Sequence, residues 1–115
     1  MDDLYYGDYI ELDTILNSQH PRSFTKMEDG NDEMLFIIIH QAYELWFKQV
    51  IFELDRVRRI FIGGAINDNA GEMGAAARKL KRIVKILELA HQQVGVLETM
   101  TALDFLEFRN YLLPV

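Results

Sequence analysis

The stretch NDEMLFIIIHQAYELWFKQVIFELDRVRRIF, residues 31–61, decides the fold, because no glycine or proline interrupts it. Asn31 is a good N-cap, and Asp32 and Glu33 place negative charge in the first turn, where the helix dipole favours it. The first half of the stretch is apolar on nearly every side, which predicts a helix enclosed on most sides. The second half is amphipathic, and its apolar face consists of Val50, Ile51, Leu54, Val57 and Phe61. The pattern therefore predicts one long central helix.

A short first helix is predicted before this stretch. Its apolar residues recur at helical spacing and are Tyr9, Leu12, Ile15 and Leu16. We expect the His20-Pro21 step to end it, because the residue before a proline disfavours the helical conformation.

Two further helices are predicted after the long stretch. A glycine-rich turn over residues 63–71 precedes a third helix over residues 72–97. The apolar stripe of this helix is Met73, Leu80, Val84, Leu87, Val94 and Leu97. A basic run lies mostly on its other side and is interpreted as a solvent-exposed face, namely Arg78, Lys79, Lys81, Arg82 and Lys85. Thr101 and Asp104 resemble a capping box, which opens a fourth helix that carries Phe105, Phe108, Arg109 and Leu112 and ends at Pro114.

No segment alternates as a strand does, so the fold class is all-α, an antiparallel helical bundle with one long central helix. The length of 115 residues allows one domain, residues 1–115. A net charge of −6 argues against nucleic acid as a partner. The chain has no cysteine, its N-terminus is acidic, and no apolar run reaches the roughly 18 residues of a membrane span. We expect a soluble cytoplasmic protein with no membrane partner.

His40 is the residue with the most chemical interest, because it lies in the apolar half of the long helix, four residues after Phe36 and four before Glu44. One interpretation is a core histidine whose hydrogen bonds are satisfied. The other is an imidazole that binds a substrate or an iron-bound ligand within an apolar pocket. Glu44 gives His40 a metal-ligand spacing, but two ligands do not make a metal site. His20 and His91 have no evident partner and are interpreted as structural.

Arg109 follows Phe105 and Phe108, and an arginine beside aromatic rings can bind a carboxylate through two hydrogen bonds. The alternative is a surface ion pair with Asp104 or Glu107. The N-terminal tyrosines, Tyr5, Tyr6 and Tyr9, either anchor the first helix to the core or pack on another subunit. From the residues alone we obtain a fold and a buried histidine, but no reaction.

Three stretches together resemble a known family. Tyr6-Gly7-Asp8-Tyr9-Ile10 is similar to its Y-G-x-Y-L element, and NDEMLFIIIHQAYELWFKQ, residues 31–49, resembles its HDExLFIIxHQxxELWxKQ helix. LETMTALDFLEFRNYL, residues 97–112, resembles its fourth-helix element. The family is tryptophan 2,3-dioxygenase, whose members are all-α, haem-dependent and homotetrameric. The resemblance spans nearly the whole chain.

The resemblance implies a role for each candidate residue. His40 matches the catalytic histidine on the distal side of the haem, which approaches the indole N–H of L-tryptophan. Phe36 matches the phenylalanine that packs on the indole ring, and Arg109 matches the arginine that binds the substrate carboxylate. Tyr6, Tyr9 and Ile10 match residues that the family lends to the pocket of a neighbouring subunit. The family's partners are therefore L-tryptophan, O2 and further copies of the chain.

Two departures from the family pattern matter. Asn31 stands where the family usually has a histidine. The family also continues with a C-terminal half that supplies the proximal haem ligand, so this chain holds no metal ligand of its own and is expected to be inactive in isolation. Three hypotheses remain: one piece of a tryptophan 2,3-dioxygenase, a shortened and inactive binding or oligomerisation module, or a haem-dependent oxygenase of another indole or phenol.

Overall fold

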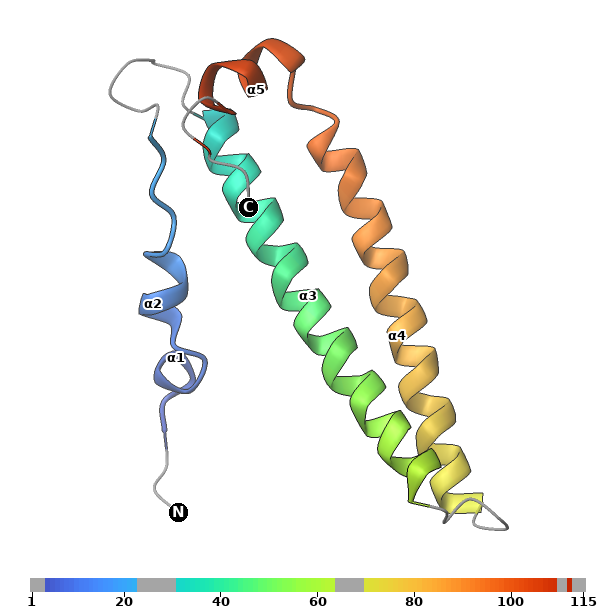
Figure 1. The fold of residues 1–115 in the computed structure, drawn as a ribbon. Helices are drawn as coiled ribbons and strands as arrows, with labels where there is room; N and C mark the ends of the chain where they lie inside the picture. Colours follow the sequence, from blue (N-terminus) through green and yellow to red (C-terminus); the bar gives the residue numbers. More distant parts are fainter. Residues whose placement is uncertain (1–3, 23–30, 64–69, 110–111, 113–115) are drawn as a thin grey trace. The chain divides into compact units, whose positions relative to one another are not determined.

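A computed structural model of the chain describes residues 4–22, 31–63, 70–109 and 112, and every regular element in these ranges is a helix. The helices are α1 (Tyr6–Tyr9), α2 (Leu12–Leu16), α3 (Asn31–Ile62), α4 (Ala70–Leu97) and α5 (Ala102–Arg109) (Figure 1). The prediction of an all-α fold is therefore confirmed. The chain divides into two compact units, residues 1–38 with 100–115 and residues 39–99. The predictions of a single domain and of a closed bundle stay predictions.

The first predicted helix is two short helices in the structure. Glu11 separates α1 from α2 and has a φ of 55°, in the left-handed region, so the helix cannot continue through it. Asn17 then caps α2, and its Nδ2 donates to the carbonyl oxygen of Asp13 at 2.7 Å. The expectation that His20-Pro21 ends this helix is wrong, because α2 already ends at Leu16.

The two long helices agree closely with their predicted bounds. The prediction of residues 31–61 compares with Asn31–Ile62, and that of residues 72–97 compares with Ala70–Leu97. Gly63 follows α3 and donates its N–H to the carbonyl oxygen of Arg59 at 2.9 Å. A Cβ at Gly63 would lie 3.1 Å from that oxygen, so the turn leaves little room for a side chain.

The fourth predicted helix is shorter than expected. It corresponds to α5, which ends at Arg109, whereas the prediction included Leu112. Leu112 lies outside the helix, with its N–H bound to the carbonyl oxygen of Arg109 at 3.0 Å. Pro114 and the side chains of Asp104 and Phe108, which were part of this prediction, lie outside the described residues.

The second unit is an antiparallel hairpin, in which α4 returns alongside α3 (Figure 1). The Tyr43 hydroxyl of α3 donates to the carbonyl oxygen of Ala90 in α4 at 3.0 Å. We call the facing residues the seam. They are buried or half-buried and recur at alternating intervals of three and four, as in a coiled coil: residues 39, 43, 46, 50, 53, 57 and 60 of α3 and 72, 76, 79, 83, 86, 90, 93 and 97 of α4.

The sequence pattern identified the wrong stripe of α4 as its packing face. Five of the six predicted residues are exposed, namely Met73, Leu80, Val84, Leu87 and Val94. The buried apolar residues of α4 are instead Ala76, Ile83, Ile86 and Ala90. The prediction for α3 is wrong in a similar way, because Ile51, Leu54 and Phe61 are exposed whereas Val57 is buried. Each helix has apolar residues on more than one side, and one neighbouring helix covers only one side.

Two of the exposed stripes lie on the same side of the hairpin. Phe47, Leu54 and Phe61 each come directly after a seam residue of α3, and Leu80, Leu87 and Val94 each come directly after a seam residue of α4. Each of the six is therefore rotated away from the seam of its own helix by the same angle and in the same sense. In an antiparallel pair, the same rotational sense leads to the same side. We call these six residues the side face. It is an apolar surface of the kind that marks interaction sites.

Within the described residues, none of the helices combines the length and apolar character that crossing a membrane requires.

We predict that neighbouring residues of α4 differ sharply in their contribution to stability. Ile86 is 7% exposed and Leu87 is 49% exposed. Ile86→Ala should lower the free energy of unfolding by about 2–5 kcal/mol, because it leaves a cavity in the seam. Leu87→Ala should change it by about 0.5 kcal/mol, as for a surface position. Urea unfolding followed by circular dichroism measures both, and equal losses would contradict the seam as described.

Candidate functional site

The first unit brings two aromatic residues together. The Phe36 ring of α3 lies 5.7 Å from the Phe105 ring of α5, measured between centroids, with the ring planes tilted by 43°. Both residues are half-buried. They are 69 positions apart in the sequence, so no local pattern could predict the contact. Phe36, one of the predicted substrate-binding residues, therefore has an aromatic neighbour that the sequence analysis did not assign to the site.

Arg109 is the last residue of α5, the helix that also carries Phe105. It is exposed, which leaves its guanidinium accessible to an anion. Its position at the C-terminal end of the helix is favourable for a cation, because the helix dipole is negative there. The alternative of a surface ion pair with Asp104 or Glu107 involves side chains outside the described residues.

Glu33 fixes the segment that precedes α3. The residue is 4% exposed, and both oxygens of its carboxylate accept the backbone N–H of Arg22, Oε1 at 3.0 Å and Oε2 at 2.9 Å. The sequence analysis assigned Glu33 only to the helix dipole. The structure shows that it also binds the residue after Pro21 and so holds the N-terminal segment near the start of α3.

His40 belongs to the second unit and is exposed, so the prediction of a buried histidine is wrong. Within that unit α4 covers the seam, and His40 lies one position beyond the buried seam residue Ile39. The imidazole meets the edge of the Tyr43 ring, with centroids 6.2 Å apart and planes at 78°. Tyr43 in turn stacks on Phe47 at 5.8 Å. An aromatic neighbour is therefore present, as the site assignment requires.

His40 also begins an apolar stripe of α3. The residues that follow it at intervals of seven are Phe47, Leu54 and Phe61, the α3 part of the side face, and all three are exposed. Glu44, the other half of the hypothetical metal pair, is exposed as well. Among the residues that the structure describes, no group of three or more His, Asp or Glu could hold a metal ion. The Tyr43 ring beside the imidazole and the stripe that follows it give His40 an aromatic and apolar setting.

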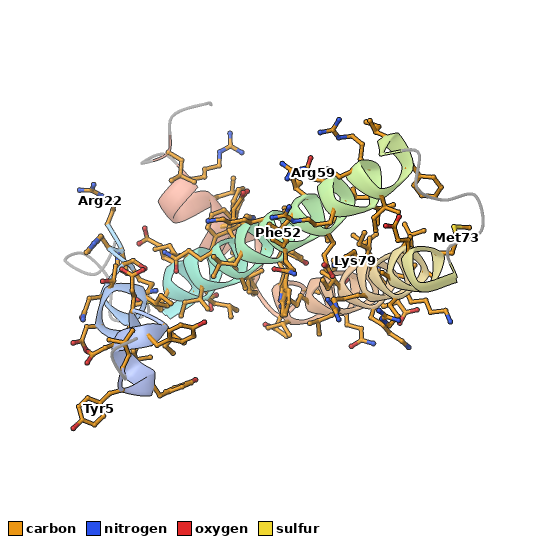
Figure 2. The ribbon with its side chains drawn as sticks, turned by 90° about the horizontal axis from the view of Figure 1, so that it is seen from below. Tyr5, Arg22, Phe52, Arg59, Met73 and Lys79 are labelled. Atoms are coloured by element: carbon orange, nitrogen blue, oxygen red, sulfur yellow. The ribbon has the colours of Figure 1, made fainter. Side chains whose placement is uncertain are left out.

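The remaining predicted residues lie on or beside α1. Tyr6 and Tyr9 are 75% and 74% exposed, and Ile10, directly after the helix, is half-buried. Tyr5, which precedes them, is also exposed (Figure 2). The tyrosines therefore do not anchor α1 to a core within the first unit, which leaves their rings available to another molecule.

Three hollows of the surface lie away from these residues. One is lined by Arg56, Arg59, Ile60, Gly63, Glu72 and Lys79. The others are lined by Val84, Leu87, Glu88, His91 and Gln92 and by Ala42, Leu45, Trp46 and Gln49. Neither Phe36, His40 nor Arg109 lines any of them. His91, interpreted as structural, is exposed and lines the second hollow.

Acidic residues of α3 organise the cations near the turn of the hairpin. Glu53 is buried and contacts Lys79 and Arg82 of α4, two members of the basic run that was interpreted as solvent-exposed. A glutamate at a seam position was the sequence feature that could have indicated this cluster. Asp55 is on the surface, where a hydrogen bond from Arg58, helped by the charge of Arg59, lowers the pKa of the carboxyl below its ordinary value of 3.8.

Comparison with known proteins identifies the family. A sequence model of tryptophan 2,3-dioxygenase matches residues 1–115. The tryptophan 2,3-dioxygenase of Bdellovibrio bacteriovorus is 52% identical over 111 residues, which is 96% of this chain and 30% of that protein. The enzyme of Rattus norvegicus is 53% identical and tryptophan 2,3-dioxygenase A of Danio rerio is 54% identical, each over 96% of this chain and 27% of the relative. The chain thus spans less than a third of the length of these relatives, and it belongs to the tryptophan 2,3-dioxygenase family.

Proposed function

We propose that the chain supplies the substrate-facing part of a haem-dependent tryptophan 2,3-dioxygenase, which inserts O2 into L-tryptophan to give N-formylkynurenine. The family match over all 115 residues carries this proposal. The first unit supports it, because the Phe36–Phe105 ring pair and Arg109 occur in one compact unit. Aromatic rings and a cation in the same unit suit an amino acid that has an aromatic side chain and a carboxylate.

Each candidate residue has a defined task in this proposal. Phe36 packs on the indole ring, and Arg109 binds the substrate carboxylate through two charge-assisted hydrogen bonds. His40 accepts the indole N–H through an imidazole nitrogen and holds the ring in orientation. Tyr6, Tyr9 and Ile10 complete the pocket of a neighbouring copy, and the high exposure of the two tyrosines supports that role. The proposed location is cytoplasmic.

A haem would supply the oxygen chemistry, while the protein orients the indole and keeps out water. The surroundings of His40 fit the substrate side of a haem, because the imidazole stands beside an aromatic ring and begins an apolar stripe. In the family the proximal ligand comes from sequence beyond the stretch matched by this chain. The residues described here are therefore assigned to substrate binding and not to iron ligation.

The second candidate function is a catalytically inactive binding or oligomerisation module. The exposed side face supports it, because an apolar surface of this extent favours association. An oxygenase of another indole or of a phenol is less well supported, since Arg109 would then lack the carboxylate that its position suits.

We predict that Arg109→Leu in the assembled enzyme weakens L-tryptophan binding by about 1.5–3 kcal/mol, roughly tenfold to a hundredfold, because it removes a charge-assisted bond. Isothermal titration of L-tryptophan and of 3-methylindole, which lacks the carboxylate, measures the effect. Binding of 3-methylindole should change little. Arg78→Leu, at another exposed arginine, serves as the control. Equal losses for both ligands would show that Arg109 is structural.

We also predict that the 115-residue chain alone yields no N-formylkynurenine above a free-haem control. A bound haem would need a protein ligand for its iron, whereas His40 is assigned to the indole N–H. Co-expression with the part of the Bdellovibrio bacteriovorus enzyme beyond the matched region should yield product in an absorbance assay. Turnover by the chain alone would mean that the ligand lies within these 115 residues. Absence of turnover in both samples would favour the inactive module.

Self-association is the third expectation of this proposal. The side face and the exposed Tyr6 and Tyr9 should drive formation of a dimer or a larger assembly at micromolar concentration. Light scattering of the chain measures its mass. Replacing both tyrosines by serine should shift the equilibrium toward the monomer, whereas replacing Thr14 of α2, also exposed but not aromatic, by alanine should leave it unchanged. A wild-type chain that is monomeric at these concentrations would contradict the expectation.

A further inference from the structure

Among the described residues of the hairpin, Glu53 is the most deeply buried. It is 1% exposed and occupies a seam position of α3. Its Oε2 lies 2.9 Å from Nη1 of Arg82, and its Oε1 lies 3.5 Å from Nζ of Lys79. Both cations come from α4, and Figure 2 labels Lys79 beside α3. The Arg82 side chain is 58% exposed and that of Lys79 is 28% exposed, so each cation reaches the carboxylate from the edge of the seam.

Burial of this carboxylate makes its partners indispensable. An ionised carboxylate that leaves water is strongly destabilised unless a cation and hydrogen bonds compensate it. The two cations have an alternative, because their long side chains can extend to solvent. Separation is therefore costly for Glu53 but not for the two cations. An arrangement of the helices that takes Lys79 and Arg82 away from Glu53 is unfavourable.

The apolar residues of the seam do not fix the register by themselves. The seam repeats every seven residues, so Ala76, Ile83 and Ala90 occupy equivalent positions along α4. If α4 slid by seven residues, one apolar residue would take the place of another. Small and branched side chains of this kind tolerate exchange when their total volume is kept.

Glu53 distinguishes among these registers. In the structure it lies opposite Lys79, which shares its seam position with Glu72 and Ile86, seven residues to either side. A slip of seven residues in one direction places Glu72 opposite Glu53, and two carboxylates then face each other. A slip in the other direction places Ile86 there, and the carboxylate has no cation. Of these three registers, only the observed one places a cation opposite Glu53.

We propose that the Glu53–Lys79–Arg82 cluster sets the register of the α3–α4 hairpin. It thereby determines which turn of α4 lies beside the half of α3 that carries His40. The Tyr43–Ala90 hydrogen bond exists only in this register, and Tyr43 is the aromatic neighbour of His40. The proposal goes beyond the assigned function and does not depend on it. A buried polar residue that specifies register is a known device in coiled coils.

The register can be measured directly, because the chain has no cysteine. Glu44→Cys on α3 and Ala77→Cys on α4 give two unique spin-label sites in the full 115-residue chain, and both positions are exposed. A slip of seven residues moves one label by about 10 Å along the helix axis. Double electron–electron resonance reports the distance between the labels, and dilution with unlabelled protein restricts it to pairs within one molecule.

The deciding variant is Glu53→Leu, which removes the carboxylate but keeps an apolar side chain in the seam. We expect helix content by circular dichroism to stay near that of the parent, while the single narrow distance peak becomes broad or divides into peaks. Asp55→Asn is the matched control, since Asp55 forms surface ion pairs with Arg58 and Arg59 on the same helix. It should keep the parent peak. A Glu53→Leu protein with the unchanged narrow peak overturns the proposal.

A second set of variants, in which the charges of the cluster are exchanged, tests the proposal if the Glu53→Leu protein loses its helix content. Glu53→Lys alone should lose the parent peak, because three cations then meet in the seam. Combining Glu53→Lys with Lys79→Glu, Arg82→Glu and Glu72→Gln should restore the parent peak, since the parent register again pairs opposite charges and the slipped register no longer offers a carboxylate at position 72. If the combined variant does not restore that peak, the cluster does not set the register and the proposal is wrong.

Discussion

The contact between α3 and α4 along a single seam is the constraint on which the rest of the second unit depends. Alanines at positions 76 and 90 keep the α4 side of the seam narrow, and the Tyr43 hydroxyl reaches the Ala90 carbonyl oxygen directly. In a pair of helices, each helix can cover only one face of the other. The exposure of the side face, and of His40 at its end, follows from this geometry and not from any polarity of the residues there.

The helices themselves could be predicted because their determinants are local. Uninterrupted stretches between glycines gave α3 and α4 to within two residues at each end. The packing face could not be predicted, since α4 has two apolar stripes and the one with larger side chains is exposed. The larger side chains of Leu80 and Leu87 led to their prediction as the packing face. In the structure the helices approach closely, and the small Ala76 and Ala90 form that face instead. Local hydrophobicity does not contain the information that decides between the two stripes.

Long-range pairs account for most of what the sequence analysis missed. Glu53 and Arg82 are 29 residues apart, and Glu33 and Arg22 are 11 residues apart. A periodic pattern predicts that such charged residues are exposed to solvent, because it contains no information about partners that are distant in the sequence. The candidate site shows the same division: the resemblance supplied roles for Phe36 and Arg109, while the ring of Phe105 beside Phe36 was visible only in the structure.

The exposure of His40 bears on how the proposed site would become functional. An imidazole in water exchanges hydrogen bonds with solvent, whereas orientation of an indole N–H requires that water be kept out. His40 shares its stripe with Phe47, Leu54 and Phe61, so a partner that covers these side chains along the whole stripe also covers the imidazole. Burial of the apolar side chains would then supply the free energy for desolvating the histidine. For the proposed enzyme we therefore expect that association at the side face also helps to hold the substrate in orientation at His40.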